Sequence, residues 1–437
     1  MEQSELIHKN QTTNRPRTKN QNLTILLVII VFAIANSLMI EDCRCQWVQQ
    51  YTGTSNNLYD IKFLNERTGW VVGASGTLLK TTNSGINWIQ MGFPVGGKTF
   101  RGIHIVDSNV TYVVGYDETI IKTTNGGNNW IIIRNGPPVQ GSSYFCVYFV
   151  NKDTGWIAGS GAKVLKTTNG GETIDSVFVN GGWFYDMYFK DANTGCMSEE
   201  GRVFKTTNGG VSWYPALSYV LGYIFMKITF FNNTYGWICA LNGKAVFRTT
   251  DFGSNWSLID TTIPGMASIY FINKDTGFMG GNTNRLYKTI DGGFTWRREN
   301  TVTNNQQFES IKFVNDTVGW VAATSGIILH TTSGGEPVVN ISLIGSGIPI
   351  DFKLYQNYPN PFNSITRIPF EISKKSNINI SVFDILGREI ETVINKAFEP
   401  GKYEISYSAD KISSGIYFYK MVINGSVSIS NKFLLKK

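Results

Sequence analysis

Few side chains in this sequence are placed for catalysis, and two carboxylates are the most suggestive of them. Asp60 and Asp186 occupy equivalent positions in the first and fourth units of an internal repeat, and Glu309 stands one residue away from that position in the seventh unit. A glycosidase requires two carboxyl groups that flank the bond to be cleaved. If the repeat closes into a ring, units one and four lie nearly opposite each other, so Asp60 and Asp186 are the candidate catalytic pair. The simpler alternative is that each is a polar residue near the start of a strand.

A second candidate site is apolar and would bind a ligand without any chemistry. Two residues before the Asp60 position, each of the seven units carries a large apolar side chain. At the mouth of a ring, such a set would form an apolar binding surface. The alternative is that these residues pack between neighbouring units. The candidate binding residues are Leu58, Phe100, Tyr144, Phe184, Phe225, Met266 and Phe308.

The sequence gives no basis for a metal or cofactor site. The five cysteines include no C-x-x-C pair and the three histidines are far apart, so a zinc site is not predicted. The net charge of +7 is spread over 437 residues, so the composition does not indicate a nucleic-acid partner. The residues concerned are Cys43, Cys45, Cys146, Cys196 and Cys239, with His8, His104 and His330.

These candidate residues are positioned by a repeat that runs from Trp47 to Gly335. Its clearest phrase, Lys-Thr-Thr-Asn-Gly-Gly-Asn-Asn-Trp, covers Lys122–Trp130, and a Thr-Gly-Trp-like start precedes each copy. The aromatic position of that start recurs at spacings of 40 to 44 residues. Every unit contains four short strand-like runs separated by turn residues, which is the pattern of propeller blades. The seven positions are filled by Trp70, Tyr112, Trp156, Cys196, Trp237, Phe278 and Trp320.

The seventh unit ends early, and the beginning of the chain offers the missing strand. Residues 335–337 stand where a fourth strand with its Trp is expected. Trp47 precedes Trp70 by the distance that separates other fourth-strand tryptophans from the next unit. We therefore predict that Gln46–Tyr51 pairs with Ile327–Thr331 and that Trp47 is buried. Such pairing would remove two exposed sheet edges.

The complete prediction is an all-β chain: a seven-bladed β-propeller closed by the N-terminal strand, followed by a small C-terminal Ig-like β-sandwich. The apolar segment near the N-terminus is typical of a signal peptide, with a retained anchor helix over Leu23–Ile40 as the alternative. After cleavage, no stable transmembrane segment is expected. The boundaries are 1–45 for the signal peptide with cleavage within 35–45, 46–336 for the propeller, 337–350 for a linker and 351–437 for the sandwich.

The repeated phrase resembles the Asp-box, or bacterial neuraminidase repeat. Its alternation with Thr-Gly-Trp over residues 47–335 resembles the photosystem II stability/assembly factor family. The resemblance implies a propeller in which each box fastens strands three and four, and a family that binds a membrane-protein segment during assembly. That family's arginine-lined surface has no obvious counterpart here, because the arginines do not share one position in the units. The cationic residue that opens each phrase is expected on a solvated rim.

The end of the chain resembles the type IX, or Por, secretion C-terminal sorting domain. The resemblance implies export across the inner membrane, recognition by the type IX secretion machinery, and a location that is secreted or on the outer cell surface. The alternative is an ordinary adhesive β-sandwich. The phrases that carry the resemblance are Leu354–Asn363, Val382–Ile390, Ser414–Tyr419 and Lys432–Lys437.

Asp-box propellers include sialidases and some glucanases, so the resemblance also carries a hydrolase alternative. The Arg-Ile-Pro motif that often marks a first sialidase arginine occurs at Arg367–Pro369, but it lies in the sorting domain and is interpreted as chance. Seven near-copies of one box indicate a scaffold, since an active site needs asymmetry. The sequence favours a non-catalytic binding or scaffold protein with a protein or glycan ligand. The alternative is a glycoside hydrolase that uses Asp60 and Asp186.

Overall fold

The computed structural model describes residues 47–137, 143–299, 301, 305–335, 341–345, 347–409 and 412–437. These residues form an all-β chain, in which the helical segments are two single 3-10 turns, η1 (Ala74–Gly76) and η2 (Thr324–Gly326). No helix in this part of the chain is long and apolar enough to cross a membrane. The expected signal peptide, 1–45, lies outside the described residues, as does Gln46 of the expected closing strand.

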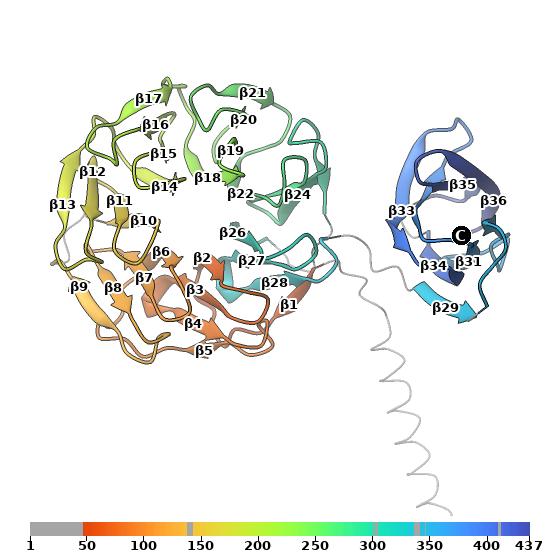
Figure 1. The fold of residues 1–437 in the computed structure, drawn as a ribbon, viewed down its shortest axis with the longest axis horizontal. Coiled ribbons are helices and arrows are strands. Elements are labelled where there is room, and N and C mark those ends of the chain that lie inside the picture. The colour runs from red at the N-terminus through yellow and green to blue at the C-terminus, as the bar shows by residue number, and fades with distance from the viewer. Residues whose placement is uncertain are drawn as a thin grey trace, which may run out of the picture. The chain divides into compact units, whose positions relative to one another are not determined.

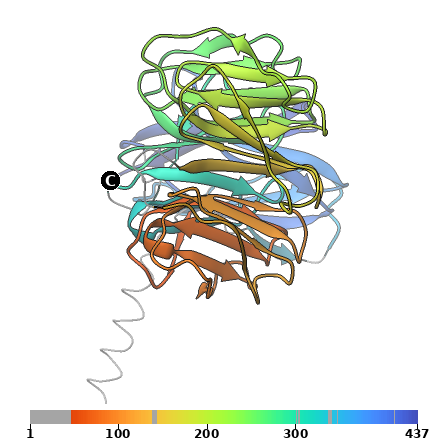
Figure 2. The same cartoon turned by 90° about the vertical axis from the view of Figure 1, so that its left-hand side faces the viewer.

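In the described part of the chain, seven four-stranded antiparallel sheets follow one another around a ring (Figure 1). The first strand of each sheet lies at the centre and the fourth lies at the rim. In the view turned by 90°, the strands run across the thickness of the ring (Figure 2).

The strand bounds of sheets 1 to 4 are as follows. Sheet 1 contains β2 (Leu58–Phe63), β3 (Gly69–Gly73), β4 (Leu78–Thr81) and β5 (Ile89–Gln90); sheet 2 contains β6 (Phe100–Ile105), β7 (Thr111–Gly115), β8 (Ile120–Thr123) and β9 (Ile131–Arg134). Sheet 3 contains β10 (Tyr144–Phe149), β11 (Gly155–Gly159), β12 (Lys163–Thr167) and β13 (Asp175–Phe178); sheet 4 contains β14 (Phe184–Phe189), β15 (Gly195–Glu199), β16 (Val203–Thr206) and β17 (Tyr214–Leu217).

The remaining sheets of the ring complete the repeat. Sheet 5 contains β18 (Phe225–Phe231), β19 (Tyr235–Ala240), β20 (Val246–Thr249) and β21 (Ser257–Asp260); sheet 6 contains β22 (Met266–Phe271), β23 (Gly277–Gly281), β24 (Arg285–Thr289) and β25 (Arg297–Arg298). Sheet 7 contains β26 (Phe308–Phe313), β27 (Gly319–Ala323), β28 (Ile328–Thr331) and, from the start of the chain, β1 (Val48–Gln50).

The ring is closed by the N-terminal strand, as the sequence predicts. Val48 pairs with His330 and Gln50 with Ile328, in antiparallel register. Trp47 has no exposed surface and packs edge-on against Phe278 and Phe313, with ring centroids 5.8 Å apart in each pair. The two ends of the repeat are thereby joined in one sheet, and sheet 7 gains the fourth strand that its own sequence lacks.

Each Asp-box fastens its own turn with side-chain hydrogen bonds. In sheet 2, Thr123 Oγ1 accepts from the backbone N–H of Gly127 at 2.8 Å, and Asn125 Oδ1 accepts from that of Asn129 at 2.9 Å. Gly127 has φ +91°, and a Cβ there would lie 2.1 Å from a ring carbon of Trp70 in the preceding sheet. A glycine is therefore required both by the turn and by the close approach of the neighbouring sheet.

In at least four of the seven sheets the cationic residue that opens the phrase joins neighbouring sheets, which corrects the expectation of a solvated rim for those residues. Lys122 Nζ donates to the backbone carbonyl of Gly170 at 2.9 Å, and Lys288 Nζ donates to that of Gly334 at 2.8 Å. In both cases the acceptor lies in the Asp-box turn of the next sheet. The strand-two tryptophans reach the same turns, because Trp237 Nε1 donates to the carbonyl of Gly292 at 2.8 Å. We call the hydrogen bond from the cationic side chain to a backbone carbonyl in the next Asp-box turn the inter-sheet clamp.

The C-terminal domain consists of two four-stranded antiparallel sheets around one apolar core that includes Ile380, Tyr419 and Phe433. One sheet is ordered β29 (Ile341–Gly345), β34 (Gly401–Ser408), β31 (Ile365–Ile372) and β30 (Lys353–Leu354). The other is ordered β33 (Glu389–Phe398), β32 (Ser376–Phe383), β35 (Gly415–Ile423) and β36 (Val427–Leu435).

The start of this domain differs from the expected linker over 337–350. Residues 341–345 form the edge strand β29, which pairs with β34. The glycines and prolines of the segment indicate a linker, but the short run Ile341–Ile344 has enough β-forming residues to add to an existing sheet edge. A short strand of this kind gains its stability from the partner strand, so its own sequence predicts it poorly.

Candidate functional site

The inner strand of every sheet carries a β-bulge at the same place. In β2 the pairing with β3 passes from Leu58 directly to Asp60, and a corresponding shift occurs in the other six inner strands. A bulge leaves one residue unpaired, so the alternation of side chains between the two faces of the strand is interrupted there. The bulge therefore determines which residues reach the central channel.

The unpaired residues line one end of the channel, which we call the channel mouth. Together with Lys227 they surround a cavity of about 20 Å³, a volume that can hold one water molecule. Since every inner strand contributes at least one residue, with both Met226 and Lys227 coming from β18, the cavity lies at the centre of the ring. The channel mouth is formed by Tyr59, Arg101, Phe145, Tyr185, Met226, Ala267 and Glu309.

Aromatic rings occupy one side of the channel mouth. The Arg101 guanidinium carbon lies 4.1 Å from the ring centroid of Tyr59 and 5.8 Å from that of Phe145. Phe145 stacks on Tyr185 with centroids 5.9 Å apart and also contacts Trp183, whose side chain is half exposed. The guanidinium is thus held against aromatic faces, an arrangement that arginine favours.

Two charged groups, Arg101 and Glu309, lie at the channel mouth. Arg101 Nε is buried without a hydrogen bond to any residue that the structure describes. The Glu309 carboxyl group is shown with no hydrogen bond or ion pair among the described residues, and its charged neighbours are Arg101 and Lys227. Burial raises the pKa of Glu309, although Arg101 and Lys227 act in the opposite direction. A buried polar atom without a partner is costly, and at the channel mouth this applies to Arg101 Nε.

Below the channel mouth lies a layer of buried charges, which we call the polar layer. Asp60 Oδ1 accepts from Lys62 Nζ at 2.9 Å and from Ser310 Oγ at 2.8 Å, and it lies 3.6 Å from Lys227 Nζ. Burial alone would raise the pKa of Asp60, but Lys227 and Lys62 lower it to about 2. Asp60 therefore stays ionised and links the inner strands of sheets 1, 5 and 7.

The structure brings the sequence-predicted pair Asp60 and Asp186 to the same polar layer, with Lys227 in electrostatic contact with both. Asp186 Oδ2 accepts from the backbone N–H of Ile228 at 3.1 Å, and burial raises its pKa. The two carboxylates thus have pKa values shifted in opposite directions, as in many acid–base pairs. The adjoining cavity of about 20 Å³ has room beside the pair for about one water molecule.

The apolar column predicted as a binding surface is buried, which corrects that expectation. All seven side chains lie in the apolar cores between neighbouring sheets and have almost no exposed surface. The reason is the bulge, since the residue that follows each of them turns toward the channel in its place. The residues are Leu58, Phe100, Tyr144, Phe184, Phe225, Met266 and Phe308.

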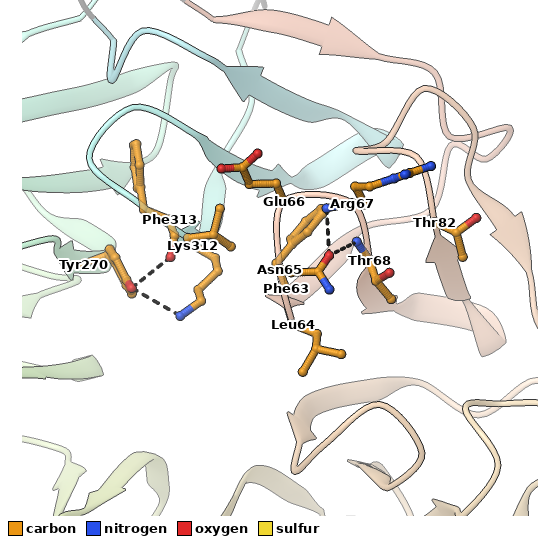
Figure 3. A pocket seen from close by; sticks show the side chains of 11 residues that line it. Phe63, Leu64, Asn65, Glu66, Arg67, Thr68, Thr82, Tyr270, Lys312 and Phe313 are labelled. Atoms are coloured by element: carbon orange, nitrogen blue, oxygen red, sulfur yellow. Dashed lines mark hydrogen bonds between the residues drawn. The ribbon is translucent and has the colours of Figure 1, made fainter.

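A larger hollow of about 910 Å³ lies beyond the opposite ends of β2 and β26 (Figure 3). Its polar groups are largely engaged with one another. Lys312 Nζ donates to the Tyr270 hydroxyl at 3.2 Å, and that hydroxyl donates to the carbonyl of Phe313 at 3.1 Å. Asn65 Oδ1 accepts from the backbone N–H groups of Arg67 and Thr68, which closes the loop after β2. In this hollow the side chains of Lys312, Tyr270 and Asn65 are thus engaged in hydrogen bonds within the protein.

Sequence reasoning misses the residues that form the channel mouth. From the sequence, Arg101 is only one of several scattered arginines, and Glu309 is only a misplaced member of the Asp60 column. One signal could have found them: the position after the apolar column holds polar, charged or aromatic residues in five of seven units, unlike a core position. Among the described residues, no group of three or more His, Cys, Asp or Glu side chains could hold a metal ion.

The architecture and the site at the centre of the ring define the class of protein, which is a β-propeller of repeated antiparallel sheets followed in the chain by a C-terminal β domain. A family model described as photosynthesis system II assembly factor YCF48 matches residues 40–144, 91–182 and 264–350, together more than half of the chain. A second model, described as a secretion system C-terminal sorting domain, matches residues 356–436. The chain belongs to the YCF48 assembly-factor family of propellers and carries a sorting domain for type IX secretion to the outer cell surface.

One curated relative is the photosystem II assembly lipoprotein Ycf48 of Synechococcus sp. (strain CC9902). It is 31% identical over 117 residues, which make up 25% of this chain and 35% of the relative. The chain thus matches about a third of the length of that relative. A match over this length supports membership of the same family, but it does not show that the two proteins bind the same partner.

Solved structures show the same fold at low sequence identity. "YCF48 bound to D1 peptide" superposes with a TM-score of 0.57 at 20% identity, covering 66% of this chain and 97% of that one. YCF48 from Cyanidioschyzon merolae gives a TM-score of 0.55 at 20% identity, covering 65% and 98%. Virginiamycin B lyase from Staphylococcus aureus gives 0.56 at 14% identity, covering 65% and 98%. Because a binding protein and a lyase both match, the fold alone does not decide the function.

Proposed function

We propose that this protein is a non-catalytic binding protein of the outer cell surface, and that its ligand site is the channel mouth. The observation that carries the proposal is the convergence of two charged groups, Arg101 and Glu309, with the aromatic residues Tyr59, Phe145 and Tyr185 around the centre of the ring. Apolar surface with a few convergent polar groups is the usual composition of a binding site. The sorting domain supports a location where an extracellular ligand is accessible.

The proposal includes a finer description of the domains. The seven sheets of the ring are the blades of one closed seven-bladed propeller over residues 46–336. The two C-terminal sheets form an Ig-like sandwich that serves as the sorting domain, with the signal peptide over 1–45 removed on export. The closing pair of Val48 with His330 supports the blade count, and the two-sheet core of the C-terminal domain supports the sandwich.

A solved relative supports binding rather than catalysis. In that structure a YCF48 protein is bound to a D1 peptide, so a propeller of this family is able to hold a peptide ligand. The present chain shares 20% identity with it. We carry over only the general role of ligand binding, because the ligand of this chain has to fit its own channel mouth.

The hydrolase alternative rests on the opposed pKa shifts of Asp60 and Asp186. Two features favour a structural role for them instead. Asp60 is held by Lys62, Lys227 and Ser310, and the space beside the pair holds about one water molecule. An acid pair that joins strands across the channel is expected to stabilise the ring rather than to reach a sugar.

The proposal is tested with the mature protein and one double variant. Wild type, Arg101→Met/Glu309→Gln and the surface control Lys274→Met are applied to immobilised panels of oligosaccharides and of unfolded polypeptides. The expected result is that wild type and control bind at least one member, and that the double variant binds it at least tenfold more weakly. Hydrolysis is tested in parallel by measuring the release of reducing ends from the oligosaccharides by wild type and by Asp186→Asn. Equal binding by the double variant, or sugar release that Asp186→Asn abolishes, would overturn the proposal.

A further inference from the structure

The charges of the channel mouth restrict the kind of ligand that it accepts. Arg101 offers a cation whose Nε is buried and unpartnered among the described residues, and Glu309 offers a carboxyl group on the inner strand β26. An anionic ligand would meet Glu309, and a cationic ligand would meet Arg101 and Lys227. A like charge at such close range in a poorly solvated site is unfavourable. A neutral ligand that both donates and accepts hydrogen bonds satisfies the two groups together.

The aromatic side chains indicate the shape of the ligand. Trp183 directly precedes β14 and is 51% exposed, and its ring lies 5.9 Å from Phe145, which in turn stacks on Tyr185. Aromatic faces carry partial negative charge and pack well against flat C–H surfaces. A ligand with a flat apolar face and hydroxyl groups along its edge would therefore contact the rings with its face and the two charged groups with its edge.

The same end of the ring carries further exposed apolar side chains. Tyr219 and Leu221 lie in the connection between β17 and β18, which leads into the next inner strand, and they are 55% and 83% exposed. The Arg202 guanidinium lies 5.6 Å from the ring centroid of Tyr219 and supports it from the β15–β16 turn. Exposed rings on successive loops favour a ligand that extends away from the channel axis over sheets 4 and 5.

We propose that the channel mouth binds a neutral polysaccharide, a proposal that rests on the proposed function. One pyranose ring lies across the opening of the cavity, whose volume of about 20 Å³ is too small to admit it, and packs on Trp183. Its hydroxyl groups hydrogen-bond to Arg101 and Glu309 at the rim of the cavity, and the following sugars pass over Tyr219. Arg101 donates to the sugar oxygens through the edge of its plane, because the face of the plane is covered by Tyr59. Glu309 accepts from sugar hydroxyls, or donates to them when it is protonated. The chain is held without any bond being broken.

The experiment compares three probe classes on the mature protein. The neutral probes are hexasaccharides of glucose, mannose, galactose and xylose; the anionic probe is a hexa-uronate; the polypeptide probe is carboxymethylated unfolded casein. Affinity is measured by calorimetry at physiological salt. The variants are Trp183→Ala and Tyr185→Ala. The control is Tyr214→Ala, an exposed tyrosine on the outermost strand β17 of the same sheet. Circular dichroism melting checks that each variant is folded.

The expected result is binding of at least one neutral hexasaccharide, weakened at least tenfold by Trp183→Ala and by Tyr185→Ala and unchanged by Tyr214→Ala. Preference for the hexa-uronate or for casein, lost in Arg101→Met/Glu309→Gln, would overturn the polysaccharide assignment while leaving the binding function intact. Neutral-sugar binding that survives both aromatic variants would also overturn it, because the site would lie elsewhere. If no probe binds in a manner that depends on the channel mouth, both proposals fail together.

Discussion

Replacing Trp47 by alanine tests how much the N-terminal strand contributes to the ring. Trp47 has no exposed surface and contacts Phe278 and Phe313 edge-on. Its Nε1 has no hydrogen-bond partner among the described residues, so the loss is one of packing alone. Truncating a buried Trp to Ala costs about 3–5 kcal/mol. For a domain of this size, that corresponds to a fall in melting temperature of roughly 6–10 °C.

The assay follows from where the tryptophans lie. All 11 are found between residues 47 and 320, so tryptophan fluorescence, excited where tyrosine does not absorb, reports unfolding of the propeller without a contribution from the C-terminal domain. The matched control is Val48→Ala, since the neighbouring Val48 side chain is 59% exposed and its loss should cost no more than about 0.5 kcal/mol. A Trp47→Ala melting curve that overlays the Val48→Ala curve would refute the argument that this strand seals the ring.

Three further changes test other features of the molecule. Lys205→Met should destabilise the propeller by about 1.5–3 kcal/mol, because Lys205 is buried and its Nζ donates to the Phe252 carbonyl and to Ser254 Oγ. The control Lys274→Met, at an exposed ion pair, should cost less than about 1 kcal/mol, and denaturant titration compares the two variants. Burial, assisted by Lys62, lowers the pKa of His104 to about 3, so the folded protein keeps this ring neutral, whereas the unfolded chain protonates it below its usual pKa of 6.5. The free energy of unfolding should therefore fall as the pH drops from 6.5 towards 3. His104→Phe should flatten this part of the curve in urea titrations, and an unchanged slope would contradict the assignment. Deleting residues 351–437 should leave a folded propeller in the periplasm, and surface labelling of intact cells that still detects the truncated protein would exclude the sorting role of the C-terminal domain.

The sequence predicts the ring well because its signals are repeated and local. Turn residues, apolar strands and the spacing of Trp47 from Trp70 each depend on residues close together in the chain, and seven copies reinforce one another. The pairing of Val48 with His330 follows from the same spacing, although it joins residues at opposite ends of the propeller. A missing strand at one end and an unmatched one at the other permit a single closed solution.

The site is harder to predict, because it depends on a one-residue irregularity. Strict alternation places Leu58 and Asp60 on one face and Tyr59 on the other, but the bulge between Leu58 and Asp60 re-aims Tyr59 toward the channel. The bulge is visible only once the register of both strands is known. The inter-sheet clamp escapes prediction for a related reason, since the acceptor of Lys122, the Gly170 carbonyl, lies in the following unit and carries no side-chain signal.

The inter-sheet clamp affects how a duplicated repeat unit could be added to such a ring. The donor side chain lies in one unit and the acceptor is a backbone carbonyl in the next, as for Lys80 with Gly126 and Lys122 with Gly170. A backbone carbonyl is present whatever residue occupies the position, so a copied unit meets its new neighbour with a fitting donor and acceptor already in place. Where the two ends of the repeat meet, Gln50 donates to the Ser84 carbonyl and accepts from Trp88 Nε1 in place of the lysine. Units inserted away from that junction would therefore inherit working interfaces, whereas those at the junction would need a new partner for Gln50.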